Sequence, residues 1–258
     1  GKSNFLHVII SELVTTYPPN ALNIYAIDLK GVEFNVYAGA CNPHFKLIAS
    51  NMSAEIGLEA LREIERLMKA RQAQFAAETV NRLSQYVQKT GSVLPRLVLI
   101  IDEFHRLFET SHTTAQEAEK ILTNLLKQGR SFGIHLLLAT QSLLAGKVNA
   151  QQIKSLVSVR VALRANDPRE HRELFGSSFA APRELGTPGY ALIMDTMVGN
   201  EDGTVFRCPL MSDEARQSFL TTYRAVSAER GYATSTAILL DGVAKADIRM
   251  NEALGALA

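Results

Sequence analysis

The chain has little cysteine and no excess of charge of one sign. Its 258 residues include only two cysteines, Cys41 and Cys208, which are too few for a disulfide scaffold and fit a reducing compartment. Lysine and arginine total 27 against 26 acidic residues, so the net charge of +1 provides no broad basic surface for nucleic acid. Any contact with DNA must therefore be local, or built by several subunits together.

The sequence also lacks long apolar segments and metal-ligand patterns. The longest apolar runs, 97–101 and 134–139, have the length of strands and fall far short of the roughly 18 to 20 residues of a membrane-spanning helix. The six histidines are scattered, without carboxylates or thiols at zinc-ligand spacing, and are expected to be ordinary surface or core residues. The chain is expected in the cytoplasm, either free or anchored to a membrane through segments outside these residues.

Strand-length apolar segments alternate with helical patterns. Buried strands are expected at 23–29, 46–50, 95–101, 134–140 and 156–163, with a closing pair at 190–194 and 204–208 and a strand-like tail at 237–240. Helices are expected at 3–17, 53–75, 167–175 and 212–223, with another ending near Tyr86 and one that Thr114 and Glu117 would open as a capping box. This alternation predicts an α/β fold with a mostly parallel sheet and helices on both faces, in three layers.

The first three residues match part of a phosphate-binding motif. Gly1-Lys2-Ser3 corresponds to the end of the signature G-x-x-x-x-G-K-[ST] and stands directly before a helix, whose N-terminus offers unpaired N–H groups and a positive dipole to phosphates. Lys2 would reach the β and γ oxygens, and the Ser3 hydroxyl would ligate Mg²⁺. The triplet alone is common, but its context predicts an ATP and Mg²⁺ site in a chain that begins inside the loop.

A carboxylate pair follows the most apolar strand. Asp102 and Glu103 come directly after Leu97–Ile101, where Asp102 would hold Mg²⁺ through water and Glu103 would polarise the attacking water. The alternative is that the pair only opens a polar loop. A pair at the exit of a buried parallel strand faces the ligand edge of the sheet, which favours the catalytic interpretation.

Two further residues are candidates by position. If strand 134–140 lies between the phosphate-loop strand and the Asp102 strand, Gln141 emerges beside the γ-phosphate as a sensor, although spacing alone fits an ordinary polar strand end equally well. Arg130, on an exposed turn, can act as an arginine finger that completes a neighbour's site. Exposed arginines without such a role are, however, more frequent than fingers.

Together these segments resemble the FtsK/SpoIIIE-type translocase motor domains over nearly the whole chain. The most specific match is Gln128–Gln141 (QGRSFGIHLLLATQ), and further matches are Gly1–Ser3, Ile27–Lys30, Leu99–Phe104, Arg160 and Asp167–Arg169. The resemblance implies a RecA-like ATPase that works as a ring, commonly a hexamer, and pumps double-stranded DNA through its pore. It also implies nucleotide ligands at Lys2 and Ser3, a magnesium and water-activating pair at Asp102 and Glu103, a sensor at Gln141 and a finger acting in trans at Arg130.

The chain departs from the family pattern at both ends, and other functions stay open. The first glycine of the phosphate loop and its strand are absent, and so is a winged-helix module, which argues against chromosome segregation. The N-K-x-D motif of GTPases and the L-S-G-G-Q motif of ABC transporters do not occur.

The main alternative is a type VII secretion ATPase, which shares the fold and moves protein; Glu103 and Ala139–Gln141 favour the DNA motor. A third possibility is a degenerate scaffold domain. We expect a motor domain at 1–232 and a connecting segment at 233–258.

Overall fold

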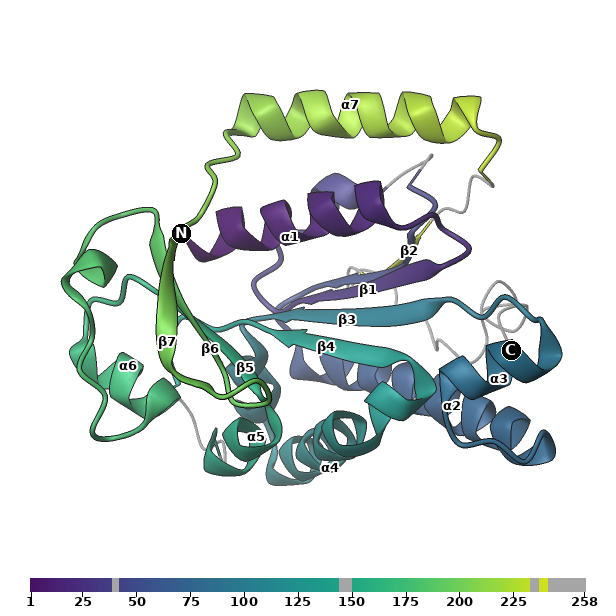
Figure 1. Cartoon of the computed structure of the whole chain (residues 1–258), viewed down its shortest axis with the longest axis horizontal. Coiled ribbons are helices and arrows are strands. Elements are labelled where there is room, and N and C mark those ends of the chain that lie inside the picture. The colour runs from purple at the N-terminus through teal and green to yellow at the C-terminus, as the bar shows by residue number, and fades with distance from the viewer. Residues whose placement is uncertain (39–41, 144–149, 233–236, 241–258) are drawn as a thin grey trace.

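The centre of the molecule is a five-stranded parallel sheet. The computed structural model describes residues 1–38, 42–143, 150–232 and 237–240. In the order β4-β3-β1-β2-β8, every neighbouring pair of strands runs parallel (Figure 1). The strands are β1 (Leu22–Asp28), β2 (Phe45–Ser50), β3 (Arg96–Asp102), β4 (Ile134–Leu138) and β8 (Ile238–Leu240). The prediction of an α/β fold with a mostly parallel sheet is confirmed.

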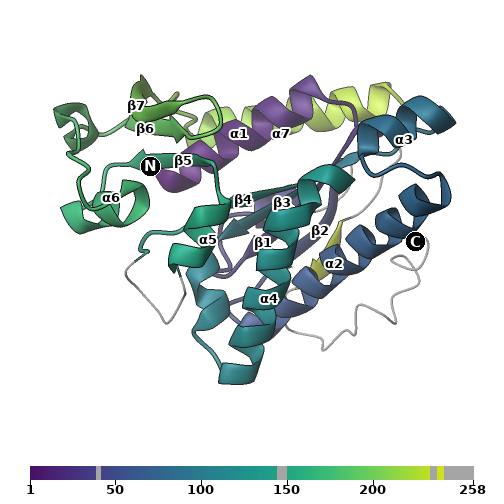
Figure 2. The same cartoon turned by 60° about the horizontal axis from the view of Figure 1, so that its bottom comes forward.

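Helices cover both faces of this sheet. Figures 1 and 2 show α1 (Lys2–Thr16) and α7 (Asp213–Glu229) over one face, and α2 (Ala54–Ala77), α3 (Leu83–Thr90) and α4 (His112–Gln128) over the other. Because side chains alternate along a strand, Ile24 and Ala26 pack in the layer of α1, whereas Tyr25 and Ile27 pack in the layer of α2 and α4. Both faces of the central strands are therefore buried, which explains their continuous apolar runs.

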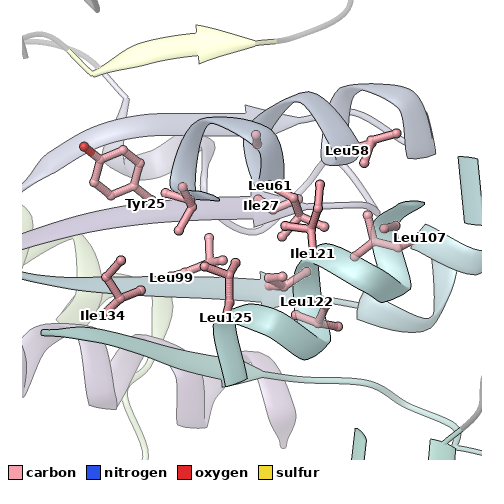
Figure 3. Packing of buried hydrophobic residues seen from close by; sticks show 14 of the residues in the cluster. Tyr25, Ile27, Leu58, Leu61, Leu99, Leu107, Ile121, Leu122, Leu125 and Ile134 are labelled. Atoms are coloured by element: carbon pink, nitrogen blue, oxygen red, sulfur yellow. The ribbon is translucent and has the colours of Figure 1, made fainter. Parts of the chain in front are cut away.

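The larger core layer lies between the sheet and helices α2 and α4. Leu58 and Leu61 from α2 and Ile121, Leu122 and Leu125 from α4 pack against Tyr25, Ile27 and Leu99 of the sheet (Figure 3). Full burial of one such side chain stabilises the fold by about 1.5–3 kcal/mol. The strands are thus clamped between two packed layers, and their carboxyl ends are held in fixed positions.

A second, smaller sheet stands beside the first. It is antiparallel, with the order β5-β6-β7, and consists of β5 (Val159–Leu163), β6 (Tyr190–Asp195) and β7 (Asn200–Arg207). Helix α6 (Pro168–Phe175) packs against β5, whereas α5 (Ala150–Leu156) packs against α4 and contributes Ile153 to the larger core. The expected strand 156–163 is therefore wrong at its start, because Leu156 ends a helix. A short apolar run does not distinguish a strand from a buried helical turn.

Several element boundaries also differ from expectation. Helix α4 begins at His112, with Ser111 as its N-cap, and the Ser111 hydroxyl accepts a hydrogen bond from the Thr114 N–H at 3.3 Å. The predicted capping box is therefore wrong, and Glu117 accepts from the Arg62 guanidinium instead. The short 3₁₀ helices are η1 (Asn35–Tyr37), η2 (Phe104–Phe108), η3 (Gly129–Phe132) and η4 (Arg183–Gly186).

The last described residues belong to the main sheet. Strand β8 pairs with β2, and both it and Ala237 lie inside the segment 233–258 that was expected to be a connection. The rest of that segment lies outside the described residues, so the domain division stays a prediction.

No helix in the described ranges has the length and apolar character needed to cross a bilayer. Cys208 is a buried free thiol, and Cys41 falls outside the described residues.

Candidate functional site

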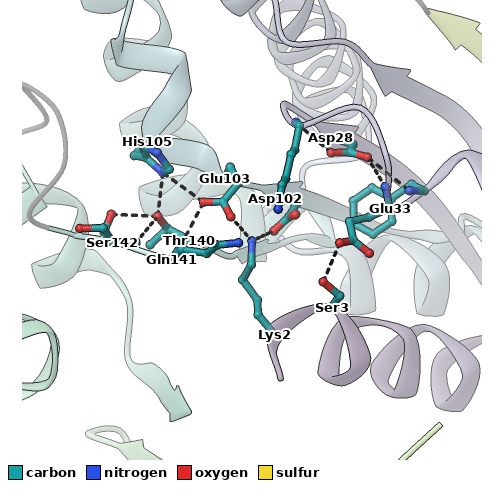
Figure 4. Close-up of polar contacts among 12 residues, drawn as sticks. Lys2, Ser3, Asp28, Glu33, Asp102, Glu103, His105, Thr140, Gln141 and Ser142 are labelled. Atoms are coloured by element: carbon teal, nitrogen blue, oxygen red, sulfur yellow. Dashed lines mark hydrogen bonds and ion pairs between the residues drawn. The ribbon is translucent and has the colours of Figure 1, made fainter. Parts of the chain in front are cut away.

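Polar groups gather where the parallel strands end. Strands β1 and β3 finish in register, with Asp28 opposite Asp102, and the N-terminus of α1 reaches the same edge of the sheet (Figures 1 and 4). There the Lys2 ammonium donates to Asp102 Oδ1 and, at 2.5 Å, to Glu103 Oε1. The fold thus joins a lysine and a carboxylate pair that are a hundred positions apart.

Glu103 is held in an unusual conformation. Its backbone is left-handed, with φ 52° and ψ 46°, a region that costs a residue other than glycine about 1–3 kcal/mol. Its Oε2 accepts the Gln141 backbone N–H at 3.0 Å and lies 3.4 Å from His105 Nδ1. The surrounding structure therefore fixes the Glu103 carboxylate at the junction of β3 and the segment after β4.

The two neighbouring carboxylates have opposite pKa shifts. Burial raises the pKa of Asp102, and the hydrogen bond from Lys2 only partly counteracts it. Burial also acts to raise the pKa of Glu103, but the Lys2 and Gln141 hydrogen bonds outweigh it, so that this pKa is lowered. Glu103 is consequently ionised at neutral pH, as a group must be to accept a hydrogen bond from an attacking water and polarise it.

Ser3 is attached to a loop that the sequence did not single out. Its hydroxyl donates to Glu33 Oε1 at 2.6 Å. The loop is folded by Asp28, which is fully buried and accepts the backbone N–H groups of Lys30 at 3.0 Å, Gly31 at 2.9 Å and Glu33 at 2.6 Å. Asp28 lies within the Ile27–Lys30 segment that the sequence singled out, whereas Glu33 was not among the predicted site residues. The available signal was an acidic residue in the turn directly after a strand that ends in aspartate.

A cavity of about 230 Å³ adjoins Glu103. Its lining combines two cationic side chains, a carboxylate and three polar side chains: Lys30, Arg106, Glu103, His105, Gln141 and Ser142. The His105 ring is held from the side by the Thr140 hydroxyl, 2.7 Å from Nδ1. Lysine, arginine and amide groups next to an ionised carboxylate suit the binding of phosphate oxygens and water.

The structure brings together five of the predicted site residues, Lys2, Ser3, Asp102, Glu103 and Gln141, and leaves Arg130 apart (Figure 4). Arg130 is exposed on η3, before β4 begins, whereas Gln141 follows its carboxyl end. At roughly 3.3 Å per residue, β4 alone separates them by on the order of 13 Å. Arg130 therefore lies at the opposite end of the strand, where its Nη1 contacts Met197 Sδ at 3.4 Å.

Gly1 and Gln141 lie at the edges of this site. Gly1 is the N-cap of α1 and is exposed, and the first N–H groups of a helix have no acceptor within it. Gln141 contacts Glu103 through its N–H and not through its side-chain amide. The exposed Gln141 side chain lines the cavity beside Glu103.

The oxygen atoms at this edge fit Mg²⁺. Ser3 and Asp102 offer hard oxygen ligands, and the buried Asp102 Oδ2 has no hydrogen-bond partner in the described part of the chain. Within those residues no group of three or more histidine, cysteine or carboxylate side chains is arranged to hold a metal by itself. Mg²⁺ commonly takes one or two protein oxygens together with substrate phosphates and water, and Ser3 and Asp102 would supply such oxygens.

The sequence matches known proteins over most of its length. The model of the FtsK/SpoIIIE family matches residues 1–145. The ESX secretion system protein YukB of Bacillus subtilis is 30% identical over 214 residues, which are 78% of this chain and 13% of that protein. ESX-1 secretion system protein EccCa1 of Mycobacterium tuberculosis is 31% identical over 193 residues, which are 69% of this chain and 25% of that protein. The chain thus spans a quarter or less of these relatives.

Solved structures share the fold. The cytoplasmic domain of the Thermomonospora curvata type VII secretion ATPase EccC has a TM-score of 0.67 at 24% identity, covering 83% of this chain and 24% of that one. The pCW3 conjugation coupling protein TcpA with ATPγS has a TM-score of 0.65 at 20% identity, covering 86% and 61%. At such identities these structures show the fold alone. With the family match and the assembled site, they lead to one conclusion: the chain belongs to the FtsK/SpoIIIE family and has its P-loop ATPase fold.

Proposed function

We propose that this chain is the ATP-hydrolysing core of a type VII secretion motor, which assembles into a ring and moves protein substrates. The observation that carries the proposed hydrolysis is the placement of Lys2 against Asp102 and Glu103 at the carboxyl ends of parallel strands. That arrangement is typical of sites that transfer phosphoryl groups.

Each residue of the site has a distinct proposed role. Lys2 leaves the carboxylates and binds phosphate oxygens, while Ser3 and Asp102 hold Mg²⁺. When bound, Mg²⁺ neutralises the charge that develops on the transferred phosphoryl group. Glu103 orients and polarises the attacking water, and Gln141 senses the γ-phosphate from the end of β4. Arg130 completes the site of the next subunit.

The relatives favour a protein cargo over DNA. Curated relatives at 30–31% identity are named as ESX or type VII secretion proteins. One structural neighbour, Thermomonospora curvata EccC, is described in complex with a signal sequence peptide. The DNA cargo was expected from the resemblance to translocases, and the net charge of +1 adds no support for it. We further propose that the motor works at the cytoplasmic side of a membrane-bound machine.

Hydrolysis is tested by Glu103→Gln in the full-length protein. Removing the charge eliminates water activation but leaves Lys2 and Ser3 in place, so turnover should fall about 10²- to 10⁴-fold while ATP affinity stays near wild type. The matched control is Glu109→Gln, which changes an exposed carboxylate 3.8 Å from the same His105 ring. Near-normal hydrolysis by Glu103→Gln, with the control unchanged, would assign Glu103 a structural role, as in a scaffold domain.

The cargo is tested by comparing two activators of the ATPase. A signal peptide from a candidate secreted protein should stimulate turnover, whereas duplex DNA should not, even at low salt. If DNA stimulates instead, with an affinity that falls steeply as salt rises, phosphate contacts are being made and the translocase interpretation replaces ours. Lys2→Ala serves as the background control for either activator.

A further inference from the structure

We propose that Glu33 positions Ser3 as the magnesium ligand, through the hydrogen bond between the Ser3 hydroxyl and the Glu33 carboxylate. The inference rests on the proposed ATPase function and deepens it. Glu33 follows the Ile27–Lys30 segment along the chain, and its contact with Ser3 at 2.6 Å arises only in the folded chain.

The chemistry of a hydroxyl group supports this role. A serine hydroxyl has one proton to donate and two lone pairs with which it can accept a hydrogen bond or bind a metal. Because Glu33 Oε1 takes the Ser3 proton, the lone pairs remain available for Mg²⁺. A carboxylate that accepts a hydrogen bond from a metal ligand orients that ligand and makes its oxygen more basic, and losing such a partner typically weakens metal binding 10- to 100-fold.

The structure holds Glu33 in place from two sides. On one side, its backbone N–H donates to Asp28 Oδ2 at 2.6 Å. On the other, Glu33 Oε2 lies 3.6 Å from His7 Nε2, and His7 Nδ1 is 2.7 Å from the Tyr37 hydroxyl. Burial lowers the pKa of His7, and so does the positive charge of nearby Arg216, so the His7 ring is uncharged at neutral pH and holds Glu33 by position.

The local charge also favours a divalent cation. Asp28, Glu33, Asp102 and Glu103 lie along one edge of the site, and Lys2 binds the last two (Figure 4). When Lys2 turns towards phosphate, the carboxylates of Asp102 and Glu103 lose its positive charge. The Glu33 carboxylate contributes a further negative charge next to Ser3, where the metal would bind.

A purely structural role for Glu33 makes a different prediction. The loop is folded by the Asp28 carboxylate through backbone N–H groups, and none of these bonds uses the Glu33 side chain. Truncating that side chain should therefore leave the loop folded. Its effect should appear in metal binding and not in the affinity for nucleotide without metal.

The experiment titrates Mg²⁺ into full-length protein bound to a fluorescent ATP analogue, and measures the affinity for the analogue in EDTA in parallel. Glu33→Ala should raise the apparent Kd for Mg²⁺ about 10- to 100-fold and leave the affinity in EDTA unchanged. Glu33→Gln keeps an acceptor for Ser3 without the charge and should fall between. The matched control is Glu55→Ala, which removes a serine–glutamate hydrogen bond of 2.7 Å, from Ser53, outside the site.

Ser3→Ala separates failure of this inference from failure of the proposed function. If Ser3→Ala weakens Mg²⁺ binding but Glu33→Ala does not, Glu33 has no positioning role and the ATPase site stands. If neither variant affects Mg²⁺, both the inference and the proposed metal site are wrong. Should Glu33→Ala fail to fold in a thermal unfolding measurement, Glu33→Gln decides, and wild-type Mg²⁺ affinity in that variant overturns the inference.

Discussion

The two sheets of this molecule differ in how completely their side chains are buried. The parallel sheet is buried on both faces, and its central strands carry residues such as Ile27 and Leu99 with no exposure. The antiparallel sheet has a small core around Leu185, Leu192 and Met194. The β6–β7 turn leaves Met197 60% and Val198 75% exposed. Within the described ranges, core clusters pack on both faces of the parallel sheet and fix its strand ends, and there the lysine and carboxylates converge.

Polar contacts connect the two sheets near the site. On α6, Glu170 accepts from the Ser142 hydroxyl at 2.5 Å and from the Leu143 N–H at 2.8 Å, directly after Gln141. On α1, the side chain of Asn4 donates to Pro209 O at 2.7 Å, in the segment between β7 and α7. Hydrogen bonds thus connect the region of the smaller sheet to the segment after Gln141 and to the first turn of α1. Each of these bonds contributes less to stability than the core packing that supports the site.

The largest expected effect on ATP turnover is that of substituting Arg130. This residue lies on η3, which connects α4 to β4 of the parallel sheet, and contacts Met197 in the β6–β7 turn. If Arg130 is a finger acting in trans, Arg130→Ala should lower turnover by about 10³- to 10⁵-fold in the assembled protein while sparing ATP binding. Steady-state hydrolysis and nucleotide titration measure the two quantities. The control is Met197→Ala, which removes the contact with the turn and leaves the guanidinium.

Mixing inactive variants distinguishes trans from cis action. In rings that combine Arg130→Ala with Lys2→Ala, some interfaces pair an intact lysine with an intact arginine, so partial activity should return. A covalently linked dimer of the two variants tests the same pairing if activity needs every subunit. Full activity in Arg130→Ala alone would rule out the finger.

Core truncation should separate the two sheets by stability. Leu99→Ala should lower the free energy of unfolding by about 3–5 kcal/mol, because its tightly packed site cannot collapse. Leu192→Ala should cost nearer 2 kcal/mol, since its partly exposed neighbours Phe175 and Val205 have room to relax. Urea unfolding measures both, with the 86% exposed Leu210→Ala as control. Equal losses would show that the smaller core is packed as rigidly as the larger.

The pH dependence of stability should have opposite signs in the two regions. The folded-state pKa of Asp102 is raised, chiefly by burial, so its contribution to stability falls as pH rises from the unfolded value through the folded one. The stability of Asp102→Asn relative to wild type should therefore increase with pH. A side-chain hydrogen bond from Arg169 lowers the pKa of Asp167 on the exposed N-cap of α6, so Asp167→Asn should show the reverse trend. Unfolding midpoints between pH 3 and 7 measure both; parallel trends would contradict this assignment.

The smallest expected effect concerns the contact between the sheets. Glu170→Ala should weaken the segment after Gln141 by about 1 kcal/mol, because the Ser142 and Leu143 donors lose their acceptor. Faster hydrogen exchange at the Leu143 amide would report it. Glu173→Ala, on the same helix but paired with Lys154, should leave that amide unchanged. Unchanged exchange in both variants would mean that the sheets are not coupled through Glu170.

Local patterns predicted the fold and much of the site. The apolar runs of β1 and β3 identify buried parallel strands, and Asp102 and Glu103 are visible as the polar end of β3. Lys2 and Ser3 are visible because the phosphate loop is a contiguous motif. The strand predicted from residue 156 was wrong at its start, because a short apolar run fits a helix end as well as a strand. The predicted capping box was wrong because the actual N-cap of α4, Ser111, precedes the apolar periodic segment.

By itself, the sequence determined the family, the α/β class and the residue types that phosphate chemistry requires, because these depend on contiguous motifs and on the period of apolar residues. Tertiary structure alone decided that Glu33 meets Ser3, that Glu103 adopts a left-handed backbone and that Arg130 faces away from its own site. It also decided that β5 to β7 form a separate sheet. Each of these depends on which distant strands lie side by side, and a contact between distant residues forms only when packing brings their elements together.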